Sequence, residues 1–354
     1  MPETAPPPPA DAGLAASREA LADAPILEVE NLVKRFPLSP GLFGGGGVVN
    51  AVSGVSFALA RGETLGVVGE SGCGKTTLGK TVMRLIEPDA GSIRLAGKDI
   101  THLPESALRA GRRDIQMVFQ DPFSSLNPRM SCGAIVAEPL EIHGLAGGRD
   151  KRERVAAMFE RVGLTREQMD RYPHQLSGGQ RQRLGVARAL ALSPSVIVAD
   201  EPVSALDVSV QAQVLNLLRD LQAEFRLAYL FISHDLAVVE HVAHRVAVMY
   251  LGKVVELAPK RDLFAAPLHP YTEALLASVP DPRPRPAGRR RERAILRGDV
   301  PSPVNPPSGC AFHTRCPIAR PICREKVPGL LPAGEGRAVA CHVRAPGGEA
   351  RDAA

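Results

Sequence analysis

A glycine-rich segment, GESGCGKTT at residues 69–77, constrains the fold of this chain more than any other feature. It fits the phosphate-binding pattern G-x-x-x-x-G-K-[ST] at every fixed position, and it lies between an expected strand, residues 64–68, and an expected helix, residues 75–86. Glycines let backbone N–H groups close around phosphate oxygens, and the N-terminus of the helix adds its positive end. The segment therefore predicts a nucleoside triphosphate site in an α/β fold, where a turn without a ligand is the alternative.

Two side chains of this segment have predicted roles of their own. Lys75 is expected to reach the β- and γ-phosphates, and the Thr76 hydroxyl to ligate Mg²⁺. Cys73 occupies a variable position of the pattern, where a small residue is sufficient. The predicted phosphate-binding residues are Gly69, Ser71, Gly72, Cys73, Gly74, Lys75, Thr76 and Thr77.

An apolar run with two acids at its end, VIVADE at residues 196–201, supplies the second half of such a site. A buried strand that ends in Asp200 places a carboxylate beside the phosphate loop, where it can hold the magnesium shell. Glu201 is then placed to polarise a water molecule for in-line attack on the γ-phosphate. Alone, this ending is a weak signal, but downstream of the phosphate loop it indicates hydrolysis.

Strands and helices are expected to alternate along the chain, which predicts a mainly parallel sheet with flanking helices. Residues 208–225 place apolar side chains on one helical face, as a helix packed on such a sheet requires. The expected organisation is a Pro-rich disordered tail at 1–24, a nucleotide-binding domain at 25–265 and an extension at 266–354. A flexible glycine-rich loop is expected at 41–47 and a Pro- and Arg-rich linker at 280–293.

The composition of the sequence bears on the cellular location expected for the chain. The sequence contains no apolar stretch of about 20 residues, the length that a membrane-spanning helix needs. Residues 1–13 are Pro-rich and acidic and do not form a signal peptide, so the chain is expected to stay in the cytoplasm. The formal net charge of +5 is ordinary for an enzyme and does not by itself indicate nucleic acid.

The segment LSGGQ, residues 176–180, carries a family resemblance. It resembles the signature sequence of the ABC ATPases, P-loop NTPases with an antiparallel β subdomain and an α-helical signature subdomain. The family's other motifs are also present in order along the chain, and the resemblance implies their roles: Phe36 as the aromatic residue that stacks on adenine, Gln120 as the Q-loop glutamine and a magnesium ligand, Asp207 in the D-loop, and His234 as the switch histidine.

The resemblance narrows to the ATPase subunits of oligopeptide and dipeptide permeases, and among these it is closer to the F-type. It is carried by QDPFSSLNP (120–128), YPHQLSGG (172–179), LHPYTEAL (268–275) and PVNPPSGCAFHTRCP (303–317). It implies an ATP-hydrolysing subunit of an importer, bound peripherally at the cytoplasmic face of the inner or plasma membrane.

Such a subunit works in pairs, and the resemblance implies a head-to-tail dimer with a D-type sister subunit. Each ATP would lie between the phosphate loop of one subunit and Ser177, Gly178, Gly179, Gln180 and Asp207 of the other. An anion cradle at the start of a helix has no local use if the chain's own loop already holds its nucleotide, although a simple helix cap is the alternative. Two integral-membrane permease subunits and, indirectly, an extracytoplasmic peptide-binding protein complete the implied assembly.

Four cysteines, Cys310, Cys316, Cys323 and Cys341, have the spacing C-x5-C-x6-C-x17-C. In a reducing compartment they favour metal binding or burial over disulfides. The spacing lacks the CxxC pairs of zinc ribbons. The family resemblance implies a [4Fe–4S] cluster, while zinc and unliganded thiols remain alternatives.

Functions other than peptide import share some of these features. The same motifs would serve a nickel-complex or glutathione importer, because the cargo is selected elsewhere in such systems. A soluble ABC ATPase acting on nucleic acid or the ribosome is disfavoured. About 100 residues without sustained heptads separate the phosphate loop from the signature segment, so the long coiled coil of chromosome-maintenance relatives is not expected. The chain also has one cassette, whereas translation-factor relatives have two. A subunit that binds without hydrolysing is disfavoured because Lys75, Glu201 and His234 are all present.

Overall fold

The computed structural model describes residues 24–38, 47–145, 147–278 and 298–346. The predicted tail lies outside these residues except for Ala24, and so do the linker at 280–293 and the glycine-rich loop except for Gly47, the first residue of a strand. Within the described ranges, no helix is long and apolar enough to cross a membrane.

The strands form two sheets, of which the smaller is antiparallel. Its order is β2-β1-β4-β5, made of β1 (Leu27–Leu38), β2 (Gly47–Leu59), β4 (Ala90–Leu95) and β5 (Lys98–Asp99). The larger sheet has the order β11-β12-β10-β9-β3-β8-β7-β6. Its strands are β3 (Thr64–Val68), β6 (Ile115–Val118), β7 (Val196–Asp200), β8 (Ala228–Ile232), β9 (Arg245–Tyr250), β10 (Lys253–Pro259), β11 (Leu331–Pro332) and β12 (Ala338–Val339).

The middle of the larger sheet is parallel, as the alternation of strands and helices predicted. Strands β6, β7, β8, β3 and β9 run in one direction, whereas β10, β12 and β11 pair antiparallel at the far edge. Strands β3, β7 and β8 are buried at every residue, because both of their faces are covered. Strands covered on both faces carry continuous apolar runs, and residues 65–68 and 196–199 have this pattern.

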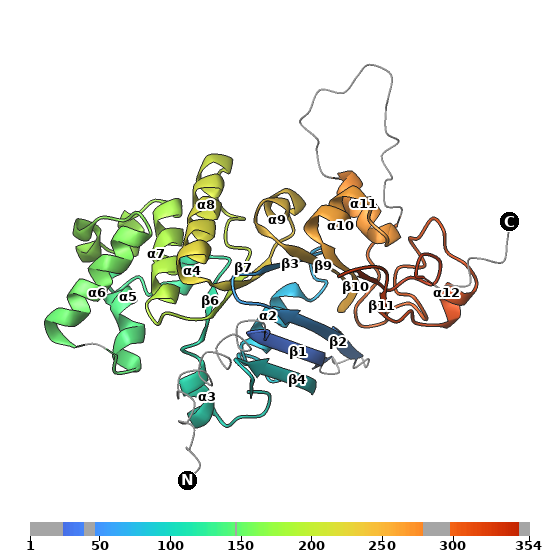
Figure 1. Cartoon of the computed structure of the whole chain (residues 1–354), viewed down its shortest axis with the longest axis horizontal. Helices are drawn as coiled ribbons and strands as arrows, with labels where there is room; N and C mark the ends of the chain where they lie inside the picture. The colour runs from blue at the N-terminus through green and yellow to red at the C-terminus, as the bar shows by residue number, and fades with distance from the viewer. Residues whose placement is uncertain (1–23, 39–46, 146, 279–297, 347–354) are drawn as a thin grey trace, which may run out of the picture.

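The helices cover the larger sheet and form a separate lobe (Figure 1). In that view α8 to α11 lie above the central strands, the antiparallel sheet lies below them, and α5 to α7 lie to the left. The helices are α2 (Lys75–Val82), α3 (Glu105–Gly111), α4 (Pro122–Ser125), α5 (Cys132–Ile142), α6 (Gly148–Arg161), α7 (Gly178–Leu190), α8 (Val208–Phe225), α9 (Leu236–Val242), α10 (Lys260–Ala265), α11 (Pro270–Ser278) and α12 (Ile322–Glu325), with 3₁₀ turns η1 (Arg166–Asp170) and η2 (Pro173–Gln175).

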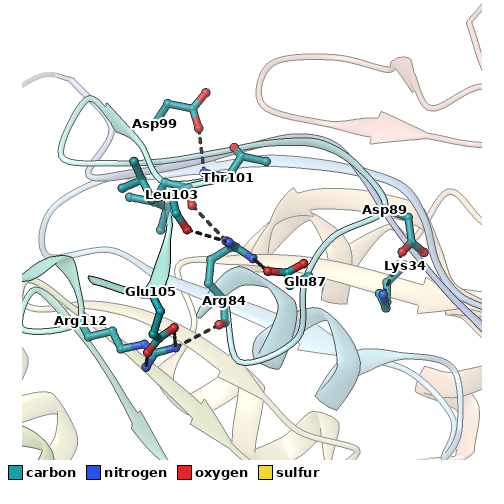
Figure 2. Close-up of polar contacts among 10 residues, drawn as sticks. Lys34, Arg84, Glu87, Asp89, Asp99, Thr101, Leu103, Glu105 and Arg112 are labelled. Carbon is teal, nitrogen blue, oxygen red and sulfur yellow. Dashed lines mark hydrogen bonds and ion pairs between the residues drawn. The ribbon is translucent and has the colours of Figure 1, made fainter. Parts of the chain in front are cut away.

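Helix α2, which follows the glycine-rich segment, ends at Val82 rather than at the expected residue 86. Arg84 adopts a left-handed backbone conformation (φ 54°), which stops the helix. Its buried guanidinium donates to the backbone oxygen of Ile100 (3.0 Å) and to that of Leu103 (3.3 Å), the second of which is labelled in Figure 2. In the same view Arg112, which pairs with Glu105, donates to the Arg84 backbone oxygen (3.3 Å). These bonds fasten the end of α2 to α3 and its preceding loop.

Helix α2 lies between the two sheets and contacts strands of both. Gly79 permits this close approach, because a Cβ atom there would lie 2.8 Å from Ile232 Cδ1 and 3.1 Å from Val198 Cγ1. The apolar residues around α2 form one core shared by the antiparallel sheet and one face of the larger sheet. The position of the phosphate loop, at the start of α2, therefore depends on packing against both sheets.

We expect Gly79→Val to lower the free energy of unfolding by about 1–3 kcal/mol, because the added side chain overpacks the space between α2 and β8. Gly111→Val is the matched control, since a Cβ atom at that helical glycine would meet nothing within 4 Å. Denaturant unfolding of both variants measures the difference. Equal stability of the two variants would contradict the packing argument.

Candidate nucleotide site

The glycine-rich segment forms the turn between β3 and α2, as expected. Gly72 and Gly74 have positive φ angles of 77° and 107°, which favour glycine. At Gly74 a Cβ atom would lie 2.0 Å from the backbone oxygen of Ala51, and at Gly69 it would lie 2.2 Å from that of Met249. The loop is therefore packed closely against its neighbouring backbone at Gly69 and Gly74, whereas Gly72 is required by its conformation alone.

Lys75 is buried within this loop, with 5% of its surface exposed. Its Nζ donates to the backbone oxygens of Gly69 (2.9 Å) and Glu70 (3.0 Å). These two carbonyl groups hold the ammonium inside the curve of the loop. The cation thus lies where a triphosphate cradled by the loop would need it.

Asp200, the last residue of β7, lies next to Thr76. The Thr76 hydroxyl donates to Asp200 Oδ1 over 3.0 Å. Burial raises the pKa of Asp200, with a smaller contribution from the neighbouring charge of Glu201. A hydroxyl and a carboxylate are the oxygen ligands that Mg²⁺ accepts beside a nucleotide, so this pair fits the predicted magnesium ligands. Gln120, the third predicted ligand, donates its amide to Glu201.

Glu201 is held in an unusual position at the end of β7. Its backbone is left-handed (φ 46°), its N–H donates to the Ile232 oxygen (2.9 Å), and its own oxygen accepts from Ser204 Oγ (3.1 Å). For a residue other than glycine this conformation costs of order 1 kcal/mol or more, and such strain clusters at functional sites. The backbone thereby turns away from the strand direction directly after Asp200.

The Glu201 carboxylate is bracketed by two other predicted residues. Gln120 Nε2 donates to Glu201 Oε2 over 2.8 Å, and His234 Nδ1 lies 3.0 Å from Glu201 Oε1. Gln120 follows β6, Glu201 follows β7 and His234 follows β8, so three neighbouring parallel strands deliver them to one edge of the sheet. The carboxyl ends of parallel strands are where α/β sheets place ligands. A carboxylate held at this edge is suited to orient a water molecule for attack on a terminal phosphate.

The signature segment caps a helix. Ser177 is the N-cap of α7: its Oγ accepts from the Gln180 N–H (3.3 Å), and the Gln180 side chain accepts from the Ser177 N–H (3.0 Å). The helix-cap alternative is therefore realised in the structure. Ser177 and Gly178 are nevertheless exposed, so the cap leaves this helix start open to a second molecule.

Asp207 similarly caps α8, accepting from the Val210 N–H (3.0 Å) and from Ser209 Oγ (2.7 Å). These bonds lower the pKa of Asp207. A Cβ atom at Gly179 would lie 2.4 Å from Val210 Cγ1, so the starts of α7 and α8 touch. Together they form one exposed surface, on which Val208 is 82% exposed.

Phe36, the predicted adenine-stacking residue, lies in β1 opposite Val49 of β2. Its ring is partly exposed, and Lys34 Nζ lies 5.5 Å from the ring centroid. An exposed ring beside a cation is free to meet a planar ligand, but the structure does not test this, so the role of Phe36 stays a prediction.

The four C-terminal cysteines form no disulfide in the part of the chain that the structure describes. The Cys310 N–H donates to the Cys323 oxygen (2.8 Å). Burial raises the pKa of Cys310 to about 11, and the neighbouring thiols of Cys323, Cys316 and Cys341 contribute in the same direction. However, the described residues contain no group of three or more His, Cys, Asp and Glu that could hold a metal ion. The predicted metal centre is therefore not supported by the structure.

Three residues around the site, Glu70, Tyr271 and Arg315, could not be found from the sequence. Glu70, inside the phosphate loop, forms a bidentate ion pair with Arg315 (2.8 and 3.1 Å), and its N–H donates to Tyr271 Oη (2.9 Å). Glu70 stands at a variable position of the motif, and its partners are 201 and 245 residues away, so no local pattern marks them.

Family models match the chain in two places. Residues 52–204 match a family described as ABC transporter, and residues 255–323 match one described as Oligopeptide/dipeptide transporter, C-terminal region. The first match contains the phosphate loop, the signature segment and Glu201. The fold and the site thus define the class: this is an ATP-hydrolysing domain of the ABC type.

Individual relatives narrow the class. The chain is 59% identical to the probable peptide ABC transporter ATP-binding protein y4tS of Sinorhizobium fredii, over 91% of this chain and 90% of that protein. It is 56% identical to the oligopeptide transport ATP-binding protein AppF of Bacillus subtilis, over 90% of this chain and 97% of that protein. The chain therefore belongs to the ATP-binding subunits of ABC peptide transporters, the family that the sequence resembles.

Solved structures agree with this fold. The dimeric ATP-binding cassette MJ0796 bound to ADP and Pi is 28% identical, with a TM-score of 0.60 over 66% of this chain and 99% of that one. The cbiO1 subunit of the cbiONQ transporter from Clostridium perfringens is 28% identical, with a TM-score of 0.59 over 69% of this chain and 92% of that one. The predicted ABC ATPase fold is confirmed.

Cys73 offers a probe of the loop. Burial raises the pKa of its thiol above the ordinary value, and its Sγ lies 3.9 Å from Lys75 Nζ. Because only the thiolate reacts, we expect labelling by a small alkylating reagent to be slow at pH 7 and to accelerate by about tenfold per pH unit up to pH 9. The adduct should abolish ATP turnover, and bound ATP should slow the labelling. Mass spectrometry and hydrolysis assays measure both.

The control for this experiment is Cys73→Ser, which should keep its activity after the same treatment. Full turnover after stoichiometric modification of Cys73 would contradict the expected crowding of Lys75.

Proposed function

We propose that this chain hydrolyses ATP at the site built by its phosphate loop, Asp200 and Glu201, and that hydrolysis drives uptake of di- or oligopeptides. The observation that carries the proposal is the placement of Glu201 between Gln120 and His234, beside the Thr76–Asp200 pair. In this proposal Glu201 acts as the general base, Lys75 holds the phosphates and His234 contacts the γ-phosphate. Mg²⁺ bound by Thr76 and Asp200 would supply charge neutralisation at the phosphates.

The nucleotide is proposed to lie between two subunits. The exposed start of α7 at Ser177 and Gly178, together with Asp207 at the start of α8, would face the γ-phosphate held by a partner's loop. The MJ0796 cassette is dimeric when bound to ADP and Pi, which supports this arrangement. We infer a D-type sister subunit as the partner, with ATP binding closing the dimer and hydrolysis releasing it.

The remaining partners follow from the transported cargo. Two integral-membrane permease subunits would contact the chain at the cytoplasmic face of the membrane, and Gln120 would report nucleotide occupancy to them. An extracytoplasmic binding protein would deliver the peptide. The names of the relatives, which refer to peptide and oligopeptide transport, support this cargo. Reconstitution of the complex in proteoliposomes, with uptake of a labelled peptide that depends on ATP, tests the assignment; ATP turnover without uptake of any peptide would refute the cargo.

We expect Glu201→Gln to lower kcat for ATP hydrolysis by about 10²–10⁴-fold, the usual contribution of a positioned general base. ATP affinity should stay close to that of the parent protein, because the amide keeps the shape of the side chain, and dimers with trapped ATP should accumulate. Single-turnover hydrolysis and size-exclusion chromatography measure the two effects.

Glu224→Gln is the matched control. Glu224 lies near the C-terminal end of α8 and forms a surface ion pair with Arg161 of α6. The variant should hydrolyse ATP normally. Unchanged hydrolysis in Glu201→Gln would show that another group activates the water.

We also propose that Cys310, Cys316, Cys323 and Cys341 hold an iron–sulfur cluster. The proposal is supported by the spacing of the four cysteines and by the family resemblance, which implies such a cluster. A zinc ion draws all of its ligands to one point, whereas a cluster distributes four thiolates over several iron atoms. The spacing of the four cysteines, which lacks the CxxC pairs of zinc ribbons, favours the cluster over zinc.

Anaerobic purification followed by iron and sulfide analysis and a visible spectrum tests the cluster. We expect iron and a broad absorption band in the parent protein and their loss in Cys316→Ser. A colourless, iron-free protein from the anaerobic preparation would end the proposal.

A further inference from the structure

Glu70, the second residue of the phosphate loop, is held at three points. Its backbone oxygen accepts from Lys75 Nζ (3.0 Å), and its N–H donates to Tyr271 Oη (2.9 Å). Its carboxylate accepts two hydrogen bonds from Arg315, at 2.8 and 3.1 Å. Tyr271 and Arg315 both belong to the region expected to form the C-terminal extension, so two of the three contacts reach the loop from outside the cassette that precedes residue 266.

The Glu70–Arg315 pair is shielded from solvent. The Arg315 side chain is 5% exposed and that of Glu70 is 24% exposed. Arg315 Nε is buried without a hydrogen-bond partner in the described structure, and Tyr250 Oη is a distant third contact at 3.4 Å. The guanidinium therefore depends on Glu70 for its main interaction, and removal of either partner would leave a poorly solvated charge.

Packed aromatic rings fix Arg315 in place. Tyr250 of β9, Tyr271 of α11 and Phe312 have ring centroids 4.7–5.4 Å apart. The backbone N–H of Arg315 donates to the backbone oxygen of Phe312 (3.0 Å). The Arg315 guanidinium lies 6.0 Å from the centroid of the Tyr250 ring. The segment that carries Arg315 is thus anchored to the central sheet, and in Figure 1 the residues after 298 lie beside α10 and α11.

The negative charge of Glu70 links the position of Arg315 to binding of the nucleotide. A carboxylate within a loop that wraps a triphosphate repels the ligand, and the repulsion is strong where solvent screening is weak. A guanidinium bound to both carboxylate oxygens neutralises that charge and fixes the geometry of the side chain. In the structure Arg315, which is 245 residues further along the chain, neutralises the Glu70 carboxylate.

We propose that Arg315 is a positioning residue of the ATP site: it neutralises Glu70 and, with Tyr271, holds the phosphate loop in its binding conformation. Through this contact the C-terminal residues control ATP affinity. The inference rests on the proposed binding of ATP by the loop, and it adds a requirement for the extension. Arg315 directly precedes Cys316, so a change at the cysteine segment would reach the phosphates by the same route.

A charge-rescue experiment tests this inference. We expect Arg315→Met to weaken MgATP binding by about tenfold, the size of one uncompensated charge near the phosphates. The effect should appear in Kd and in KM, with little change in kcat, because Glu201 and its neighbours are untouched. The double variant Glu70→Gln/Arg315→Met should recover most of the affinity, since the repelling carboxylate and the buried guanidinium are both absent. Titration of the full chain with a fluorescent ATP analogue and steady-state hydrolysis give these values.

The matched control is Arg344→Met. Arg344 forms a similar bidentate pair with Glu273 (2.6 and 3.0 Å) and also lies among the C-terminal residues, but its partner is on α11 rather than in the loop. We expect this variant to lower thermal stability without changing the Kd for MgATP. Arg315→Lys, which keeps the charge but loses the bidentate geometry, provides a milder variant if Arg315→Met does not fold, and its loss of affinity should also be rescued by Glu70→Gln.

Two results would overturn the inference. One is normal affinity in Arg315→Met, and the other is a loss of affinity that persists unchanged in the double variant, which would indicate structural damage alone. A parent protein that binds no MgATP would instead refute the proposed nucleotide site, so the two failures are distinguishable.

Discussion

The parallel register of the central strands is the constraint on which the site depends. Asp200 of β7 pairs with Ile232 of β8, and Ile232 pairs with Val67 of β3. The phosphate loop, the acidic residues Asp200 and Glu201, and the segment that carries His234 therefore begin at the same level of three adjacent strands. A shift of register along β8 would separate Asp200 from Thr76 and Glu201 from His234 together. The hydrogen bonds of the sheet thus provide the preorganisation that catalysis at a phosphate requires.

Local sequence predicted those parts of the fold that local physics determines. The strand–loop–helix unit around residues 64–82 and helix α8 were expected close to their observed limits, because apolar runs and glycine positions are short-range signals. The end of α2 was misplaced because Arg84 adopts a left-handed conformation in which its guanidinium reaches Ile100 and Leu103. Nothing in residues 75–86 alone encodes those partners.

In the site, too, residues in local motifs could be predicted, whereas contacts between distant residues could not. Lys75, Thr76, Asp200, Gln120, Glu201 and His234 were recognised from motifs, and the structure gathers them into two groups, around Thr76 and around Glu201. The direct contact of Glu201 with both Gln120 and His234 could not be predicted, since it depends on the left-handed turn after Asp200. The contacts of Glu70 were also hidden, because an ion pair between residues 70 and 315 has no sequence period.

The residues after the expected boundary at residue 266 pack onto the nucleotide-binding domain and pair with one of its strands. Strand β12 pairs with β10, where Glu256 opposes Val339, so the C-terminal residues extend the central sheet instead of standing apart from it. Buried Glu256 also accepts hydrogen bonds from the N–H groups of Leu268 and His269, which fixes the chain at the start of α11. Tyr271, two residues after His269, accepts a hydrogen bond from the Glu70 N–H in the phosphate loop. Backbone and side-chain hydrogen bonds, together with packed rings, therefore connect the cysteine-bearing segment with the nucleotide site.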